Sequence, residues 1–325
     1  MTFDSAADSA TPGPPDIQAL RQRVQEQVGQ VVIGQTGATD VVLVSAIVGG
    51  HVLLEGVPGV AKTLLTNCVA RALGMSFGRI QFTPDMLPSD VTGNSVLLDG
   101  ELRFRPGPVF TNVLLADEIN RTPPKTQAAL LESMQEQQVS IDGTTYTLPQ
   151  PFLVVATQNP VEQEGTYPLP EAQLDRFLFK VNVGYPAETD EVSMLLSAHR
   201  GLAPTAIGDI APVTNAAELL SIRAVVESTV LNETVASYIV SLIRATRHQP
   251  QVSIGASPRA AVHLMAASKA AARLGGRDFV TPDDVRFMAP PVLRHRLILT
   301  PDAELEGTRP DQVVTAVLNS VPVPR

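Results

Sequence analysis

The chain has 325 residues, of which 44% are hydrophobic and 18% charged, and its formal net charge at pH 7 is −9. This length predicts two domains, and the hydrophobic fraction is that of a globular protein with a full core. The acidic balance gives no strong signal for nucleic-acid binding, although a local basic pore is compatible with it. The absence of tryptophan and the presence of only four tyrosines leave few rings for stacking on bases.

The N-terminal residues and the cysteine content predict a soluble cytoplasmic protein. Residues 1–15 are rich in Ser, Ala, Asp, Pro and Gly and lack the features of a signal peptide, so they predict a disordered tail. The single cysteine, Cys68, excludes an intrachain disulfide and a cysteine-based metal site. The most apolar window, residues 41–54, is too short to span a bilayer and is interrupted by Gly49-Gly50, so no membrane segment is expected.

Two helices are predicted before the first strand. Apolar residues recur at three- and four-residue spacing from Asp16 to Val28, which is typical of an amphipathic helix. A second helix is predicted from Val41 to Val48, with Thr39 and Asp40 as its cap. Between the two helices, Gly34 either offers backbone contacts to a purine base or serves as a helix C-cap, and the spacing does not separate these readings.

The central stretch joins a short apolar strand, residues 51–54, to a glycine-containing loop and a helix from Leu64 to Leu73. This order is the architecture of a phosphate-binding P-loop, in which loop N–H groups and the helix N-terminus face the phosphates. Lys62 is expected to reach the outer phosphates of ATP, and the Thr63 hydroxyl is expected to bind Mg²⁺. The predicted nucleotide contacts are Gly56, Val57, Pro58, Gly59, Val60, Ala61, Lys62, Thr63 and Leu64.

Ala61 departs from the general P-loop motif, which has glycine immediately before the lysine. If the backbone of this residue has a positive φ, alanine costs roughly 1 kcal/mol or more there. The alternative interpretation of the stretch is a strand-to-helix turn that holds no ligand. The motifs farther along the chain favour the nucleotide site.

A second strand is predicted from Arg79 to Phe82, and two β-hairpins are expected after it. The dipeptides Asp99-Gly100 and Asp142-Gly143 each separate two short strand-forming runs, and such dipeptides suit a type I′ turn. Inserted hairpins often serve as contact surfaces, and the alternative is that they only decorate the edge of a sheet.

Between the hairpins, a continuous apolar run from Asn112 to Ala116 is followed by two adjacent carboxylates, Asp117 and Glu118. Buried parallel strands have unbroken apolar sequences, and ligands bind at their C-terminal ends. We therefore interpret this stretch as a Walker B element, in which Asp117 helps to hold Mg²⁺ and Glu118 orients and activates the attacking water. The alternative, an acidic helix cap after an ordinary strand, is disfavoured by the P-loop that precedes it. A helix is predicted next, from Lys125 to Gln137.

Two further strands lie beside polar residues that suit a γ-phosphate site. The strand from Phe152 to Ala156 is followed by Asn159, which is either a hydrogen-bond donor to a γ-phosphate or water, or an ordinary turn residue before proline. Arg176 directly precedes a strand from Phe177 to Val181. It is either an arginine finger that acts on another subunit or the partner of a surface carboxylate such as Asp175, and the sequence leaves both open.

No strongly apolar strand is predicted after Pro186, and the remaining chain is expected to form a second, all-helical domain. The predicted helices cover residues 188–198, 216–227, 232–247, 257–274 and 282–289. Arg259 lies in the first turn of one of them, where the helix dipole disfavours a cation, and this position indicates a bound anion. The five histidines lack metal-site spacing and are interpreted as packing or surface residues: His51, His199, His248, His263 and His295.

The stretches GVPGVAKT, LLADEINR, ATQNP, PEAQLDRF and GASPRA together resemble the MoxR family of AAA+ ATPases. The likeness runs from about Val31 to the C-terminus, and alanine before the P-loop lysine is common in this family. The resemblance implies an α/β fold, with an αβα P-loop domain of five parallel strands and two inserted β-hairpins at residues 16–186 and an all-helical lid domain at residues 187–325. It also implies a homo-oligomeric ring, usually a hexamer, with ATP at the subunit interfaces.

The resemblance also implies a role for each matched residue. Gly56, Gly59, Lys62 and Thr63 correspond to Walker A, Asp117 and Glu118 to Walker B, Asn159 to sensor 1, Arg176 to the arginine finger, and Arg259 to sensor 2, which links the lid to the nucleotide. Arg121, directly after Walker B, is a second candidate for an interface arginine. The two hairpins resemble the helix-2 insert and the pre-sensor-1 insert, which face the pore of the ring or a client.

The function implied by the resemblance is Mg²⁺-dependent ATP hydrolysis that moves the lid and hairpins and thereby remodels a partner protein. MoxR relatives usually act with proteins that carry a von Willebrand factor A domain, in assembly or metal-cofactor insertion. The alternatives are a nucleotide-dependent binding switch and a DNA-associated AAA+ motor, and the acidic balance argues against the motor.

Overall fold

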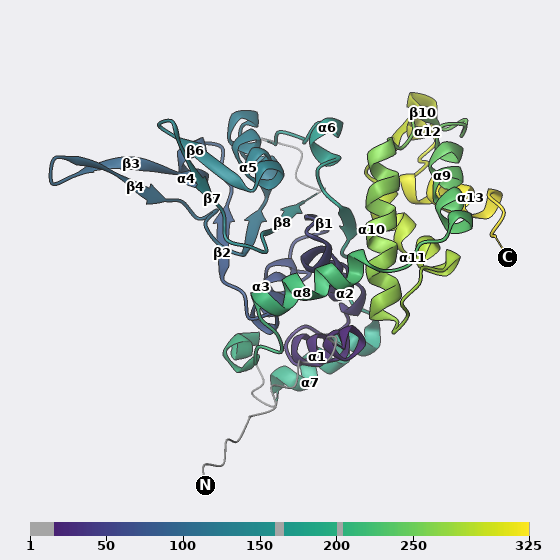
Figure 1. Cartoon of the computed structure of the whole chain (residues 1–325), viewed down its shortest axis with the longest axis horizontal. Helices are drawn as coiled ribbons and strands as arrows, with labels where there is room; N and C mark the ends of the chain where they lie inside the picture. Colours follow the sequence, from purple (N-terminus) through teal and green to yellow (C-terminus); the bar gives the residue numbers. More distant parts are fainter. Residues whose placement is uncertain (1–15, 160–165, 200–203, 325) are drawn as a thin grey trace, which may run out of the picture.

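The computed structural model describes residues 16–159, 166–199 and 204–324, and its centre is a five-stranded parallel sheet (Figure 1). In their order across the sheet, the strands are β2 Phe77–Gln81, β5 Val113–Asp117, β8 Leu153–Gln158, β1 Val52–Glu55 and β9 Phe179–Asn182. Every neighbouring pair of strands is parallel. The predicted five-stranded parallel sheet is therefore confirmed. The predicted tail, residues 1–15, lies outside the described residues.

Helices bury both faces of this sheet. Leu54 of β1 belongs to one apolar core and the adjacent Leu53 belongs to the other. The helices in contact with the first core include α1 Ile17–Gly29, α2 Thr36–Val48 and α3 Lys62–Ala72, and those in the second are α4 Pro88–Thr92 and α5 Pro124–Glu136. Because successive side chains of a strand point to opposite faces, a strand that is covered on both sides needs an unbroken apolar run.

The second helix starts earlier than expected. The predicted cap at Thr39 and Asp40 is wrong, because α2 begins at Thr36 with Gln35 as its N-cap residue. Asp40 lies inside the helix, where its carboxylate accepts hydrogen bonds from Arg21 Nη2 at 2.5 Å and from Gln25 Nε2 at 2.7 Å. Partners on α1 thus satisfy a carboxylate whose residue type alone suggested a helix end.

Both predicted hairpins are present. Strand β3 Gly93–Leu98 pairs with β4 Glu101–Pro106, and β6 Gln138–Ile141 pairs with β7 Thr144–Thr147. The φ angles are 54° at Asp99 and 83° at Gly100, and 50° at Asp142 and 78° at Gly143, as a type I′ turn requires. In Figure 1 the first hairpin projects away from the central sheet, and the second hairpin lies near the base of the first.

After β9, the described part of the chain is mostly helical and contains one small antiparallel sheet. The five predicted helices are present, and two further helices near the C-terminus, of five and eleven residues, were not predicted. The helices are α7 Glu188–His199, α8 Ala216–Glu227, α9 Glu233–Thr246, α10 Pro258–Leu274, α11 Pro282–Leu293, α12 Pro301–Leu305 and α13 Pro310–Ser320. The small sheet pairs β10 Val252–Ile254 with β11 Ile298–Leu299 and corrects the expectation of purely helical structure. Strands of three and two residues are too short to produce an alternating pattern in the sequence.

The first core extends beyond the sheet into the C-terminal half. Arg223 of α8 donates through Nε to the Ile47 carbonyl of α2 at 2.8 Å, and the same apolar cluster continues from α1, α2 and α3 through α8 into α9, α10 and α11. Figure 1 shows α7 and α8 beside α1 to α3, whereas α9 to α13 gather at the right of the view. In the described ranges, none of the helices has both the length and the apolar character that crossing a membrane requires.

Candidate active site

The predicted P-loop connects β1 to α3 with an unusual backbone. Gly56 lies against the opposite chain segment so closely that a Cβ atom there would be 2.3 Å from the Val183 carbonyl oxygen, so only glycine fits. Gly59 has a φ of 86° and Ala61 a φ of 62°. Ala61 is therefore in the left-handed region, and it forms the N-cap of α3 without a side-chain hydrogen bond. The first N–H groups of α3 thus have no side-chain cap from Ala61, an arrangement suited to an anion.

The Lys62 ammonium lies inside this loop. Its Nζ donates hydrogen bonds to the carbonyl oxygens of Gly56 at 2.5 Å and Gln158 at 3.4 Å. Burial lowers the pKa of Lys62, and the negative charges of Asp117, Glu118 and Glu55 oppose this shift. These contacts hold a cation at the point where the P-loop meets the ends of β1 and β8.

Asp117 ends β5 with both carboxylate oxygens in hydrogen bonds. Oδ2 accepts from Thr63 Oγ1 at 3.2 Å and from Arg79 Nη2 at 2.7 Å, and Oδ1 accepts from Thr157 Oγ1 at 2.6 Å. The structure thus brings Asp117 and Thr63, the two predicted Mg²⁺ ligands, together. Both supply the oxygen atoms that this cation prefers.

Glu118 follows with a left-handed backbone of φ 57°. Its Oε2 accepts hydrogen bonds from Gln81 Nε2 at 2.8 Å and from Arg121 Nη1 at 3.0 Å. Its backbone N–H donates to Thr157 Oγ1 at 2.9 Å, so the two Walker B residues share one threonine as a partner. The carboxylate predicted to activate water is therefore held by two side chains of its own chain.

Asn159 directly follows β8 and is buried. Because Glu55 at the end of β1 is in register with Gln158, this asparagine belongs to the same edge of the sheet as the P-loop. The structure therefore gathers Lys62, Thr63, Asp117, Glu118 and Asn159 at the C-terminal edge of the strands.

A mostly apolar cavity of about 360 Å³ lies beside the P-loop. Its lining includes Ile33, Gly59, Leu64 and Tyr185, and Met194 of α7. Gly34, predicted to contact a purine base, has a φ of 81° and lies against the Asp190 carboxylate, while the residues on either side of it line the cavity. The segment predicted to contact the base is therefore next to the phosphate loop.

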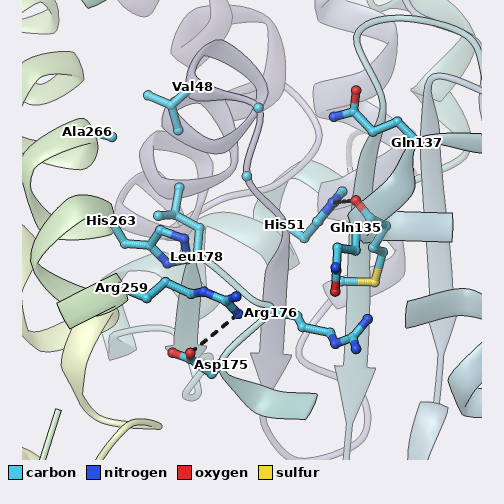
Figure 2. A pocket seen from close by; sticks show the side chains of 13 residues that line it. Val48, His51, Gln135, Gln137, Asp175, Arg176, Leu178, Arg259, His263 and Ala266 are labelled. Atoms are coloured by element: carbon cyan, nitrogen blue, oxygen red, sulfur yellow. Dashed lines mark hydrogen bonds and ion pairs between the residues drawn. The ribbon is translucent and has the colours of Figure 1, made fainter. Parts of the chain in front are cut away.

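Arg176 and Arg259 lie at the other edge of the sheet. Arg176 precedes β9, whose first residue is in register with the first residue of β1, so it belongs to the N-terminal edge of the strands. Arg176 and Arg259 line one cavity of about 320 Å³ together with His51 and His263 (Figure 2). Arg176 Nη1 donates to the Leu131 carbonyl at 2.9 Å, and Arg259 forms an ion pair with Asp175 at 3.6 Å. The structure thus places both arginines in one cavity, at the edge of the sheet opposite Lys62 of the same chain.

The histidines whose side chains the structure describes, His51, His248, His263 and His295, are packing or surface residues, as expected. His51 Nδ1 accepts a hydrogen bond from the Val154 N–H at 3.0 Å, so its proton is on Nε2, which donates to the Met134 carbonyl. Burial lowers the pKa of His51 to about 4, and burial beside Arg296 lowers the pKa of His263 to about 4. Among the described residues, no cluster of three or more His, Cys, Asp or Glu side chains is arranged to hold a metal ion.

Three site residues were missed by the sequence reasoning: Arg79, Gln81 and Thr157. Arg79 and Gln81 alternate with the buried Ile80 on β2, and Thr157 lies near the end of β8. The available signal was their position near the C-terminal ends of strands, where ligands bind in parallel sheets. Their actual partners depend on β2 and β8 flanking β5, which the strand pattern alone does not specify.

Comparison with known proteins agrees with this geometry. Residues 51–179 match the family described as the ATPase family associated with various cellular activities (AAA), and residues 244–317 match the AAA lid domain. A P-loop and an acidic strand end on a five-stranded parallel sheet, followed by a helical lid, make the protein an AAA+ ATPase.

The full-length relatives specify the family. Chaperone MoxR1 of Mycobacterium tuberculosis is 44% identical over 99% of this chain and 88% of its own. Protein MoxR of Paracoccus denitrificans is 34% identical over 90% of this chain and 93% of its own. A solved structure from Cytophaga hutchinsonii, described as a candidate ATPase, matches with a TM-score of 0.87 and 41% identity over 95% of this chain and 96% of its own. The chain belongs to the MoxR family of AAA+ ATPases.

Proposed function

We propose that this chain is a subunit of a homo-oligomeric ring, a hexamer by family resemblance, that hydrolyses ATP with Mg²⁺ to remodel partner proteins. One observation carries the proposal: the predicted catalytic groups are divided between the two opposite edges of one sheet. A single chain places Lys62 and Glu118 at one edge and Arg176 at the other. Both halves can meet one nucleotide only if two subunits contribute.

At the C-terminal edge, the chain's own residues suit ATP. Lys62 and the N-terminus of α3 would bind the phosphates, and the apolar cavity beside Ile33 would take the purine. Thr63 and Asp117 would hold Mg²⁺ together with the phosphates, and the ion would supply charge neutralisation to the γ-phosphate. Glu118 would accept a hydrogen bond from the attacking water, and Asn159 would donate one near the γ-phosphate.

At the N-terminal edge, Arg176 and Arg259 would act on the nucleotide of a neighbouring subunit. An arginine finger supplied by another chain stabilises the charge of the transition state and raises turnover by about 10³ to 10⁵. Arg121 is the weaker candidate for this role, because it already pairs with Glu118 at 3.0 Å at the edge that carries the P-loop. The isolated subunit would accordingly be almost inactive.

The partner proteins would contact the inserted hairpins. Leu97 and Leu102 are cross-strand neighbours on the first hairpin and are 70% and 73% exposed, which is unusual for paired leucines. The printed name of the Mycobacterium relative, Chaperone MoxR1, supports a protein client. Family resemblance favours clients with a von Willebrand factor A domain, and a cytoplasmic location fits such a role.

The proposal is tested by mixing two inactive variants. Lys62→Ala removes the P-loop lysine and Arg176→Ala removes the finger, so each variant alone is expected to lose ATPase activity. In a mixture, an intact P-loop can meet an intact arginine, and we expect a substantial part of the activity to return. Lys62→Ala mixed with Arg244→Ala, an exposed arginine on α9, is the control for mixing.

The outcome of this experiment separates two assignments. If the mixture stays inactive while sizing shows mixed assemblies, Arg176 is not the finger and the shared site must be assigned to other residues. The control variant Arg244→Ala should hydrolyse ATP on its own, which shows that loss of a surface arginine is not sufficient to stop turnover.

A second candidate function is a nucleotide-dependent binding switch without sustained turnover. The specific observation in its favour is that Gln81 and Arg121 both donate hydrogen bonds to Glu118 Oε2, on the carboxylate predicted to activate water. If the switch is correct, Glu118→Gln should bind ATP and keep its effect on a client. If hydrolysis is required, the same variant should trap the client instead.

A further inference from the structure

Arg296 is a buried cation that no part of the proposed chemistry uses. It lies just after α11, and its side chain is only 2% exposed. Its hydrogen bonds go to six acceptors: Asp175 Oδ1 at 2.7 Å, the Asp175 carbonyl at 3.3 Å, the Phe177 carbonyl at 2.7 Å, the Leu178 carbonyl at 3.2 Å, the Val292 carbonyl, and His263 Nδ1 at 2.6 Å. A guanidinium has five N–H donors, and every nitrogen of Arg296 is engaged.

Most of these acceptors lie next to Arg176. Four of the six belong to the short segment from Asp175 to Leu178, which carries Arg176. His295, the neighbour of Arg296, also contacts the Phe177 carbonyl through Nε2 at 3.0 Å. Two adjacent side chains after α11 therefore form hydrogen bonds to the backbone on both sides of Arg176. The Arg176 side chain itself lines the cavity.

The same residue also reaches the helix that carries Arg259. His263 is one helical turn after Arg259 on α10, and its Nδ1 accepts from Arg296, which has only donors. Asp175 completes the link, because Oδ1 binds Arg296 while Oδ2 pairs with Arg259 at 3.6 Å. Figure 2 shows the Arg259–Asp175 pair beside Arg176 and His263 in the cavity.

We propose that Arg296, acting with Asp175, is a positioning residue that locks α10 and the Asp175–Leu178 segment into one unit and so presents Arg176 and Arg259 together to the neighbouring subunit. This inference rests on the proposed function, in which both arginines act on another chain's nucleotide. A buried ion pair adds little net stability compared with apolar packing, but it specifies geometry, since each of its hydrogen bonds has a required direction. A movement of the lid helices would then move both arginines at once.

The test uses the mixture of Lys62→Ala and Arg176→Ala subunits described above. In that mixture only the Lys62→Ala subunit supplies both trans-acting arginines, and only the Arg176→Ala subunit supplies a working P-loop. Arg296→Lys keeps a positive charge but loses the five-donor fork, and it is added to one subunit at a time. We expect the recovered ATPase turnover to fall by about 100-fold when Arg296→Lys is in the Lys62→Ala subunit, and to persist when it is in the Arg176→Ala subunit.

This asymmetry separates positioning from general stability. An equal loss in both arrangements, or no loss in either, would overturn the proposal. If Arg296→Lys lowers the amount of folded subunit, Asp175→Asn takes its place, because it keeps the shape of the side chain and removes the charge that joins Arg296 to Arg259; the same asymmetry is required of it.

Two comparisons complete the design. Arg294→Lys is the matched control, since Arg294 is two residues away and pairs with Asp311 of α13 at 2.9 Å, away from the arginine segment; it should leave the recovered turnover unchanged in either subunit. If the parent mixture does not recover activity at all, the assignment of Arg176 has failed, and this result is seen before any Arg296 variant is measured.

Discussion

At the scale of single residues, the P-loop carries a strained alanine. Ala61 has φ 62° and ψ 24°, a left-handed conformation that costs an ordinary L-residue roughly 1 to 2 kcal/mol and costs glycine almost nothing. The residue caps α3 immediately before Lys62, at the helix N-terminus where the phosphates are predicted to bind. The strain is therefore located where the proposed binding site needs the unusual backbone.

Replacing this alanine with glycine should stabilise the protein. We expect Ala61→Gly to raise the free energy of unfolding of the nucleotide-free chain by about 1 kcal/mol, measured by urea titration at fixed subunit concentration. The control is Ala224→Gly, at an exposed interior position of α8, which should lower the free energy of unfolding by about 1 kcal/mol. Equal destabilisation by both changes would show that Ala61 is not strained.

At the scale of elements, the two inserted hairpins are joined by stacked aromatic rings. Phe104 of β4 stacks on Tyr146 of β7 with ring centroids 4.0 Å apart, and it also meets Phe110 edge-on at 5.4 Å. An isolated two-stranded hairpin is only marginally stable in water, so the long β3–β4 hairpin depends on what holds its base. The second hairpin directly follows α5, the helix after the predicted Walker B residues. The ring stack therefore joins the hairpin that carries the exposed Leu97 and Leu102 to the chain segment that follows Glu118.

Removing the Tyr146 ring should loosen the first hairpin selectively. An aromatic pair is worth about 0.5 to 1.5 kcal/mol, so Tyr146→Ala should speed amide hydrogen exchange in β3 and β4 by about 2- to 12-fold. Thr145→Ala, at the adjacent exposed position of β7, should leave the exchange of β3 and β4 unchanged. If exchange instead rises equally throughout the sheet, the ring supports the whole domain and not this contact.

At the scale of the whole molecule, one apolar core joins regions that the sequence divides into two domains. Helix α8 lies after the predicted boundary at residue 186, yet it packs on α2 and its Arg223 binds two carbonyls of that helix. The segment before α8 is also attached to the nucleotide-binding domain, because the Val213 N–H donates a hydrogen bond to the carbonyl of Ala72, the last residue of α3, at 2.8 Å. We infer that the nucleotide-binding unit includes α8 and that the lid domain begins after it, near residue 231.

This boundary can be tested with two fragments. Residues 16–231 keep α8 and should unfold cooperatively in urea, whereas residues 16–186 expose the apolar face of α2 and should unfold at a clearly lower urea concentration. The full chain is the reference for both. Identical midpoints for the two fragments would show that α8 contributes nothing to this unit and would restore the boundary at 186.

Several parts of the fold and site were predictable because their signals are local. The P-loop, the acidic end of β5 and the two Asp-Gly turns each depend on a few consecutive residues, and the backbone of each agrees with the prediction. The predicted cap at Asp40 failed for a physical reason: a carboxylate can be satisfied by a helix end or by a distant arginine, and Arg21 supplies the second. Strands as short as β10 and β11 carry too few residues to show any period.

By itself, the sequence determined the class of protein and the order of the strands along the chain, and it predicted the residues of the phosphate site. The tertiary structure alone decided that Arg176 and Arg259 share a cavity, that Arg79 pairs with Asp117, and that Arg296 grips a segment 121 residues earlier in the chain. Such contacts depend on burial and hydrogen-bond direction between distant segments. A guanidinium fixes the position of another chain segment only where packing excludes water, because protein carbonyls are then its hydrogen-bond acceptors.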